Sequence, residues 1–320
     1  MRVAVAGAGA FGIKHLDALA RIKDVTITAV ISRTLEQAQD VAKKYGAAFA
    51  STELDDALNS SDVDAVILCT PTQLHARQSI AALRTGKHVQ VEIPLADSLE
   101  DALEVASVAD QNDLVCMVGH TRRFNPSHQW IHQRVLRGEL RLQQLNVQTY
   151  FFRRTNTNAL GQPRSWVDNL LWHHAAHTVD LFAYQCGEPI EVAHVLAGPD
   201  HPDLGIPMDM SIQLRTGSGQ LCTLSLSFNN EGPLGTFFRY ICDNGTYVAR
   251  YDDLVTGYDE TIDVSDVAVS LDGIELQDRE FVRAIIEHDE PNSSIRSVLD
   301  CYRVLGALQE QLETDRVRQS

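Results

Sequence analysis

Residues 1–122 alternate between short apolar runs rich in β-branched residues and longer stretches with helical periodicity. The apolar runs predict strands, which cover residues 2–6, 25–32, 63–69, 88–92 and 114–119. The amphipathic stretches between them predict helices over residues 11–22, 35–45, 73–84 and 98–112. Strands that alternate with helices in this way are typical of a parallel sheet covered by helices. We therefore expect a doubly wound α/β domain at the start of the chain.

The pattern changes beyond residue 125. Further helices are predicted over residues 126–137, 171–185, 277–287 and 294–313, and one long strand is predicted over residues 142–152. Gly217-Ser218-Gly219 and Asn244-Gly245 are hairpin signals that predict antiparallel strands between these helices. We expect two domains, residues 1–122 and residues 123–320, the second being α+β with an open, mainly antiparallel sheet. Because an open sheet with one apolar face often pairs with its own copy, we expect a homodimer or a higher homo-oligomer.

Composition narrows the choice of partners and compartment. The 320 residues suffice for two cores, and 27 basic against 43 acidic residues give a net charge of −16. An acidic surface repels phosphate backbones, so we expect no nucleic-acid partner. No apolar run approaches the ~20 residues of a membrane span, and we expect no membrane insertion. The six cysteines contain no C-x-x-C pair, which favours a reducing cytoplasm and argues against a zinc–cysteine site.

A glycine-rich segment, Gly7-Ala8-Gly9-Ala10-Phe11-Gly12, directly follows the first predicted strand and begins the first predicted helix. In this context G-x-G-x-x-G predicts a Rossmann dinucleotide-binding turn. Gly7 permits the tight turn, Gly9 lets the backbone approach a pyrophosphate, and Gly12 lets helix and strand pack closely. The amides near Ala10 and Phe11 would point at the phosphates from the helix N-terminus. A glycine-rich turn without ligand is the alternative.

The end of the second predicted strand indicates which dinucleotide is bound. NAD-type sites carry an acid about 20 residues past the fingerprint, but this chain has Ser32-Arg33-Thr34, and the next acid is Glu36. Arg33 can pair with a 2′-phosphate and stack on adenine, while Ser32 and Thr34 add hydroxyl donors. We therefore expect NADP(H) rather than NAD(H). The alternative is that Arg33 is a solvated surface residue.

The fingerprint and several further segments resemble the glucose–fructose oxidoreductase/inositol dehydrogenase superfamily. Besides the fingerprint with His15 after it, the matching segments are Cys69-Thr70-Pro71-Thr72-Gln73-Leu74-His75, Gly86-Lys87-His88-Val89, His120-Thr121-Arg122-Arg123-Phe124-Asn125-Pro126, and the helix that holds His177 and Asp180. The resemblance implies that Thr70, Thr72 and His75 contact the ribose or nicotinamide of the cofactor. It also implies that Glu92 binds the nicotinamide-side ribose. His75 as a helix-start residue without a ligand is an alternative.

A second set of segments resembles those members of the superfamily that act in bacterial protocatechuate and lignin breakdown. These segments are Val91-Glu92-Ile93-Pro94-Leu95-Ala96-Asp97, Leu171-Trp172-His173-His174-Ala175-Ala176-His177, Ser225-Leu226-Ser227-Phe228-Asn229-Asn230 and Gly235-Thr236-Phe237-Phe238-Arg239-Tyr240. The resemblance implies oxidation of a dicarboxylated cyclic hemiacetal to a lactone. Most superfamily members have Glu-Lys-Pro where this chain has Glu92-Ile93-Pro94, and many have Asp at the position of His173. Both departures put the usual sugar-alcohol mechanism in doubt.

Three polar side chains, His173, His177 and Asp180, are spaced to project from one face of a helix. With the lysine absent, we expect His177 to act as the base on the substrate hydroxyl, with His173 as the second choice. Asp180 would orient a histidine or pack the helix. Two alternatives remain: a structural role, in which neighbouring groups satisfy these polar side chains, and a metal site. The glutamate of H-E-x-x-H is missing and a nicotinamide reaction needs no metal, so we expect no metal.

Several arginines gather in this acidic chain, namely Arg122, Arg123, Arg153, Arg154 and Arg164. Guanidinium–carboxylate pairing would hold a dicarboxylate substrate, although any one of them can merely balance a nearby acid. Arg122 is the first choice because it follows the last strand of the first domain, and Arg164 and Arg123 are further choices. His174 would reach the substrate from the side of the pocket.

Two other functions remain open from the sequence. One is a sugar or inositol dehydrogenase of the same superfamily, and the other is a non-catalytic NADP(H)-binding redox sensor. The missing lysine argues against the first, and the aligned histidines argue against the second.

Overall fold

The computed structural model describes residues 1–157, 161, 163–164 and 166–319, and the chain divides into two compact units. The first unit consists of Met1–Thr121 and Ile274–Leu299, and the second of Arg122–Gly273 and Asp300–Ser320. Residues 274–299 were expected in the second domain, whereas the structure groups them with the first. The physical reason is a set of contacts to the first unit, such as the 2.8 Å ion pair between Glu275 and Arg21.

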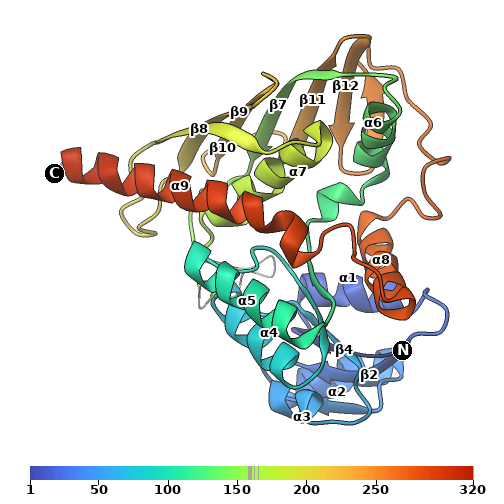
Figure 1. Ribbon diagram of the computed structural model, residues 1–320. Coiled ribbons are helices and arrows are strands. Elements are labelled where there is room, and N and C mark those ends of the chain that lie inside the picture. The colour runs from blue at the N-terminus through green and yellow to red at the C-terminus, as the bar shows by residue number, and fades with distance from the viewer. Residues whose placement is uncertain (158–160, 162, 165, 320) are drawn as a thin grey trace. The chain divides into compact units, whose positions relative to one another are not determined.

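The first unit contains a six-stranded parallel sheet in the order β3-β2-β1-β4-β5-β6. Its strands are β1 (Arg2–Ala6), β2 (Thr26–Ile31), β3 (Phe49–Ser51), β4 (Ala65–Leu68), β5 (His88–Val91) and β6 (Cys116–Val118). Its helices are α1 (Ala10–Leu19), α2 (Leu35–Tyr45), α3 (Leu54–Leu58), α4 (His75–Arg84), α5 (Leu99–Asn112) and α8 (Gly273–Glu287). The predicted doubly wound domain is confirmed, and α4 and α5 lie side by side along it (Figure 1).

Strand order places the expected cofactor residues together. The order reverses at β1, because β2 and β3 lie on one side of it and β4 to β6 on the other. At such a reversal the loops that follow neighbouring strands diverge and leave a crevice at the carboxyl ends of the strands. The loops after β1 and β4 both start at this edge.

The second unit contains a seven-stranded sheet in the order β13-β12-β11-β7-β10-β9-β8. Its strands are β7 (Leu142–Tyr150), β8 (Ile190–Ala197), β9 (Asp209–Thr216), β10 (Leu221–Ser227), β11 (Gly235–Cys242), β12 (Gly245–Arg250) and β13 (Asp253–Thr256). All neighbours are antiparallel except β7 and β10. The predicted, mainly antiparallel sheet is therefore confirmed. Both predicted hairpin turns are present, between β9 and β10 and between β11 and β12.

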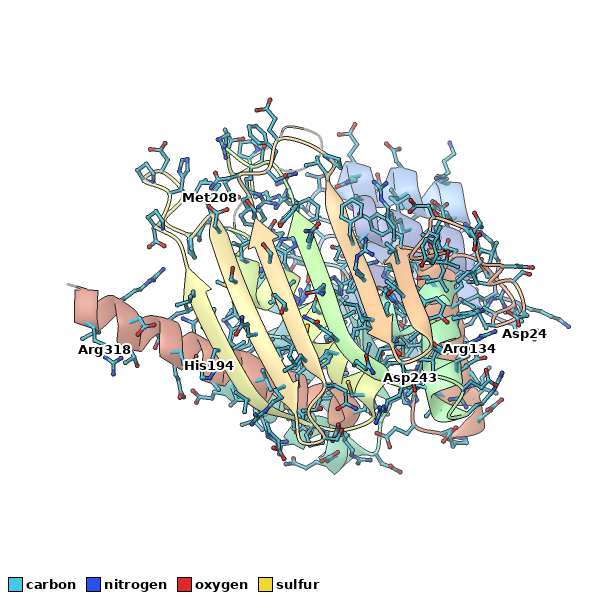
Figure 2. The ribbon with its side chains drawn as sticks, turned by 90° about the horizontal axis from the view of Figure 1, so that it is seen from above. Asp24, Arg134, His194, Met208, Asp243 and Arg318 are labelled. Atoms are coloured by element: carbon cyan, nitrogen blue, oxygen red, sulfur yellow. The ribbon has the colours of Figure 1, made fainter. Side chains whose placement is uncertain are left out.

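The helices of the second unit lie on one face of this sheet. They are α6 (Pro126–Leu136), the π-helical turn η3 (Leu170–Ala175), α7 (Ala176–Cys186) and the part of α9 (Ile295–Gln319) from Asp300 onward. Side chains that alternate along β7, such as Leu145 and Val147, are buried on this face, whereas Asn146 and Gln148 point to the other. Figure 2 shows that other face toward the viewer, with no described helix in front of its strands.

None of the helices in the described part of the chain has both the length and the apolar character needed to cross a membrane.

Candidate active site

The glycine fingerprint has the geometry that a dinucleotide needs. Gly7 has a φ of +102°, and a Cβ there would lie 2.2 Å from the Cys69 carbonyl oxygen. A Cβ on Gly12 would lie 1.8 Å from the Gly7 carbonyl oxygen, so only glycine allows α1 to begin this close to the turn. A Cβ on Gly9 would meet no atom within 4 Å, which leaves space above the backbone. Since α1 begins at Ala10, its free amides adjoin this space, and the residues fit a pyrophosphate.

The end of β2 presents one exposed cation, Arg33, as the sequence predicted. Its neighbours have local roles. The Ser32 hydroxyl donates to Gln37 at 2.7 Å, and the Gln37 side-chain amide donates to the Ala8 carbonyl at 3.0 Å. Ser32 therefore ties α2 to the glycine turn and does not supply the phosphate donor expected of it. The Thr34 hydroxyl oxygen caps α2 by accepting from the Gln37 backbone amide at 3.4 Å, which leaves the hydroxyl proton of Thr34 for a ligand.

His75 has a different role from the expected cofactor contact. It is 2% exposed, and its Nδ1 and Nε2 lie 2.8 Å from the carbonyl oxygens of Pro94 and Thr70. Burial lowers the pKa of His75, so the neutral ring donates to one carbonyl at a time. Its nitrogens connect the two loops and are not directed at a cofactor. Thr70 donates its hydroxyl to Gln78, and Thr72 is buried in the turn η1 (Thr72–Leu74).

Glu92 follows β5, as expected, with a side chain that is 12% exposed. Its Oε1 lies 3.1 Å from Nε2 of His15, a buried residue of α1. The sequence alone indicates no role for His15 beyond its position after the fingerprint.

The predicted histidine helix begins with a π-helical turn, η3, in place of a regular α-turn. Asn169 starts it by accepting from the Trp172 amide at 2.7 Å. The Asn169 backbone amide in turn donates to Nδ1 of His173 at 3.2 Å, and the His173 ring stacks on Trp166. Because Nδ1 is an acceptor, the neutral His173 ring carries its proton on Nε2. His173 is thus arranged as a hydrogen-bond donor rather than the base considered for it, while His177 lies half-buried at the start of α7.

Arg123 and Asp180 form a buried ion pair with each other. Arg123 donates from Nε at 2.8 Å and from Nη2 at 2.6 Å to the two Asp180 oxygens, and both residues are at most 5% exposed. The guanidinium also lies 4.8 Å from the Tyr184 ring centroid. This pairing does not favour the expected roles of Arg123 in substrate binding and of Asp180 in orienting a histidine, because each uses its charge on the other. It agrees with the alternative that Asp180 packs the helix.

A second arginine cluster surrounds Asp168, which is 6% exposed. Nη2 of Arg153 and Nη1 of Arg164 both contact Oδ2 of Asp168, the latter at 2.9 Å. His174 Nε2 lies 4.0 Å from the same oxygen, and its ring meets Phe228 edge-on. Burial opposes the charged carboxylate, but His174 and Arg153 hold the pKa of Asp168 well below its usual range. We call Arg153, Arg164, Asp168 and His174 the Asp168 cluster.

The Asp168 cluster includes two residues that the sequence did not single out as substrate-binding residues, Arg153 and Asp168. Asp168 follows Arg164 by four residues, a spacing that could have indicated it. Among the described residues, Nη1 of Arg153 is buried and has no hydrogen-bond partner. The cluster can therefore accept an anion without losing a contact there.

Arg122, the first choice for substrate binding, is half-buried between aromatic rings. Its guanidinium lies 5.0 Å from the Tyr251 centroid and 5.8 Å from the Phe238 centroid, and Nη1 donates to Asn125 at 3.3 Å. Burial lowers the pKa of Arg122. Among described residues its Nε has no hydrogen-bond partner. Arg154, by contrast, is exposed beside Asn229.

Within the described ranges, no three His, Cys, Asp or Glu side chains gather as metal ligands, including those near His173 and His177.

Comparison with known proteins identifies the family. Residues 1–120 match the oxidoreductase family with an NAD-binding Rossmann fold, Gfo/Idh/MocA, and residues 126–268 match the C-terminal domain of bacterial oxidoreductases. The 4-carboxy-2-hydroxymuconate-6-semialdehyde dehydrogenase of Sphingobium sp. (strain NBRC 103272 / SYK-6) is 67% identical over 313 residues, 98% of this chain and 99% of the relative.

Solved structures show the same fold. A levoglucosan dehydrogenase in complex with NADH and levoglucosan has a TM-score of 0.84 and 19% identity, covering 97% of this chain and 96% of the other. The scyllo-inositol dehydrogenase of Lactobacillus casei with bound NAD(H) and scyllo-inositol has a TM-score of 0.79 and 18% identity, covering 98% and 97%. The resemblance stated from the sequence is confirmed, and the chain is a dehydrogenase that belongs to the Gfo/Idh/MocA oxidoreductase family.

Proposed function

We propose that this dehydrogenase uses NADP⁺ to oxidise the cyclic hemiacetal form of 4-carboxy-2-hydroxymuconate-6-semialdehyde to 2-pyrone-4,6-dicarboxylate. This step belongs to the 4,5-cleavage route of protocatechuate breakdown in bacteria. The 67% identical relative, whose name states this semialdehyde as its substrate, supports the proposal. The Asp168 cluster is the structural observation that carries it.

The Asp168 cluster has more positive than negative charge. Two guanidinium groups share one carboxylate, so one positive charge is left over before the histidine is counted. In a partly dry site this charge favours an anion, and a guanidinium can hold a carboxylate through two parallel hydrogen bonds. A neutral polyol would gain much less from such a site. The cluster therefore favours a carboxylated substrate over a sugar or an inositol.

The reaction removes one C–H hydrogen and one O–H proton from the hemiacetal carbon and its hydroxyl. When bound, the oxidised nicotinamide accepts the hydrogen with its electron pair. His177 takes the hydroxyl proton as the general base, since imidazole is the side chain best suited in general to accept a proton at neutral pH. His173 offers Nε2–H as a donor that helps to orient the substrate. Because a hemiacetal hydroxyl is more acidic than a sugar hydroxyl, Ile93 can stand where most relatives carry lysine.

We further propose that NADP(H) is preferred over NAD(H). Arg33 is exposed at the end of β2, where the 2′-position of the adenosine ribose binds in this fold, and the next acid, Glu36, lies inside α2. Thr34 retains a hydroxyl proton for the phosphate, and Ser32 acts through Gln37 on the glycine turn.

The function is tested by supplying the protocatechuate ring-opening product with NADP⁺ and following coenzyme reduction and pyrone formation together. We expect the two products in equal amounts. Oxidation of neutral polyols in place of the dicarboxylate would show a sugar or inositol dehydrogenase. Tight NADPH binding without turnover of any carboxylated hemiacetal would show a redox sensor.

We also propose that the uncovered face of the seven-stranded sheet joins a second copy of the chain, giving a homodimer or a higher homo-oligomer, and that the protein works in the cytoplasm. The register of β11 with β7 places the apolar residues Phe237 and Ile241 on that face, with the polar Arg239 between them. All six cysteines are free, which suits a reducing compartment. Light scattering that finds a monomer at micromolar concentration would contradict the assembly.

A further inference from the structure

A buried polar network joins Glu92 to helix α8 within the first unit. His15 is 0% exposed, and its Nδ1 lies 2.8 Å and 3.0 Å from the two Asp278 oxygens. Its Nε2 lies 3.1 Å from Oε1 of Glu92. Asp278 is itself 0% exposed and accepts a 2.6 Å hydrogen bond from the Gln90 side-chain amide. One imidazole thus bridges two carboxylates.

The imidazole bridge requires a charged ring. Burial disfavours the charge, but the Asp278 carboxylate raises the pKa of His15 well above its ordinary value. Only the charged imidazole donates from both nitrogens, which is what two carboxylate partners need. Burial raises the pKa of the Cys69 thiol, so that group stays protonated beside the ring.

The Glu92 carboxylate is held on one side only. Oε1 meets His15 and accepts a 3.4 Å hydrogen bond from the Gln277 amide. Gly119 leaves the room for this, since a Cβ there would lie 2.6 Å from the same oxygen. Among the described residues, no hydrogen bond reaches Oε2. The network therefore fixes the orientation of the side chain and leaves its second oxygen for a ligand.

We propose that His15 and Asp278 are positioning residues for the cofactor: the charged imidazole, held by Asp278, orients Glu92 so that Oε2 accepts a hydroxyl of the nicotinamide-side ribose. This inference rests on the cofactor binding in the proposed function and goes beyond it. It makes α8, more than 150 residues beyond the last strand of the parallel sheet, a necessary part of the cofactor site.

Asp278→Asn isolates the charge of the network, because the amide keeps the shape and an oxygen for His15. Without the carboxylate, burial makes His15 neutral, and its one remaining proton stays on Nδ1 to face the oxygen of the introduced amide. The Nε2 lone pair then faces Oε1 of Glu92, and the repulsion turns the carboxylate away. At lower pH a proton on either group restores the contact.

The experiment measures the affinity of the variant for NADPH and, separately, for 2′,5′-ADP, which lacks the nicotinamide half. We expect NADPH affinity to fall about tenfold, the value of one hydrogen bond to a charged group, and 2′,5′-ADP affinity to stay unchanged. The NADPH loss should shrink as the pH falls from about 8 to about 6, while wild-type affinity stays level across this range. Thermal melting reports any loss of stability separately.

Glu275→Gln is the matched control, because Glu275 lies on the same helix at 5% exposure but pairs with Arg21 and Arg279. It should leave both affinities unchanged. His15→Gln is a second test variant, since one amide cannot donate to both the Asp278 and the Glu92 carboxylates. It should likewise lose affinity for NADPH and keep its affinity for 2′,5′-ADP. Equal loss of both ligands, or wild-type NADPH affinity in Asp278→Asn, would overturn the proposal. Absence of substrate turnover by the wild type would instead refute only the proposed function.

Discussion

The buried Arg123–Asp180 pair tests the distinction between arginines that support the fold and arginines that bind substrate. Arg123→Met keeps much of the side-chain volume and its packing on Tyr184 but removes the charge. Asp180→Asn removes the opposite charge with little change of shape. Each variant leaves a buried charge without its bidentate partner, and we expect each to lower the free energy of unfolding by about 3–5 kcal/mol. The double variant should cost less than the sum, because neither charge remains.

The two variants should respond differently to pH. In Arg123→Met, burial raises the pKa of the lone Asp180 carboxyl above its unfolded value of about 3.9. A raised folded pKa gives stability that is present at low pH and lost as the pH rises through it. The destabilisation of Arg123→Met should therefore be smaller at about pH 5 than at about pH 8. Asp180→Asn should lose the same amount of stability at both pH values, since the Arg123 guanidinium stays charged.

Urea unfolding followed by tryptophan fluorescence suits this test, because Trp130, Trp166 and Trp172 all lie in the second unit with the pair. The Michaelis constant for the substrate is measured on the same samples. A wild-type unfolding curve for Arg123→Met together with a large rise in that constant would refute the structural role of Arg123. It would also restore Arg123 as a substrate-binding residue.

Four further predictions concern single side chains. Arg33→Asp should weaken NADP binding far more than NAD binding in a titration, and equal loss would show that Arg33 does not contact the phosphate. His177→Ala should lower turnover and keep cofactor affinity, whereas full activity would place the base elsewhere. Arg153→Met should raise the substrate Michaelis constant about tenfold at unchanged NADPH affinity; an unchanged constant would exclude the Asp168 cluster as the carboxylate site. Burial lowers the pKa of His132 to about 4, with Arg123 contributing, so the folded state loses up to about 3 kcal/mol as the pH falls from about 6.5 to that value. In urea titrations at both ends of this range, His132→Phe should remove that part of the acid sensitivity, and an unchanged pH dependence would contradict it.

Local patterns predicted most of the fold because strands and helices depend on neighbouring residues. The parallel sheet, the glycine turn and the hairpin at Asn244 all follow from short segments. The strand Phe49–Ser51 was missed because three residues carry too little periodicity to stand out. The assignment of residues 274–299 to the second domain failed for another reason: helical periodicity does not indicate which sheet a helix packs on.

Site residues were predicted where one segment supplies the whole geometry and missed where the partner is distant. The fingerprint needs only six consecutive residues, so its role was readable. His15 meets Asp278 across 263 positions, and Arg123 meets Asp180 across 57. Neither pairing leaves a local signal, because the side chains are brought together by strand order and helix docking. Asp168 did leave a local signal, because it follows Arg164 by only four residues. Opposite charges at that spacing indicate an ion pair between residues close together in the sequence.

The number of carboxylates beside each buried guanidinium distinguishes arginines that support the fold from candidate substrate-binding arginines. Their positions in the sequence do so less well. A buried charge is costly unless it is compensated, so a fold retains an uncompensated one only where a ligand or function offsets the cost. Arg123 has its own carboxylate and is compensated in the empty protein. Arg153 and Arg164 share one, and under the proposed function one substrate carboxylate would neutralise the surplus charge. Arg122, with aromatic faces and an amide but no ion pair among the described residues, has the same property, and it is the strongest choice for the second carboxylate of a dicarboxylate.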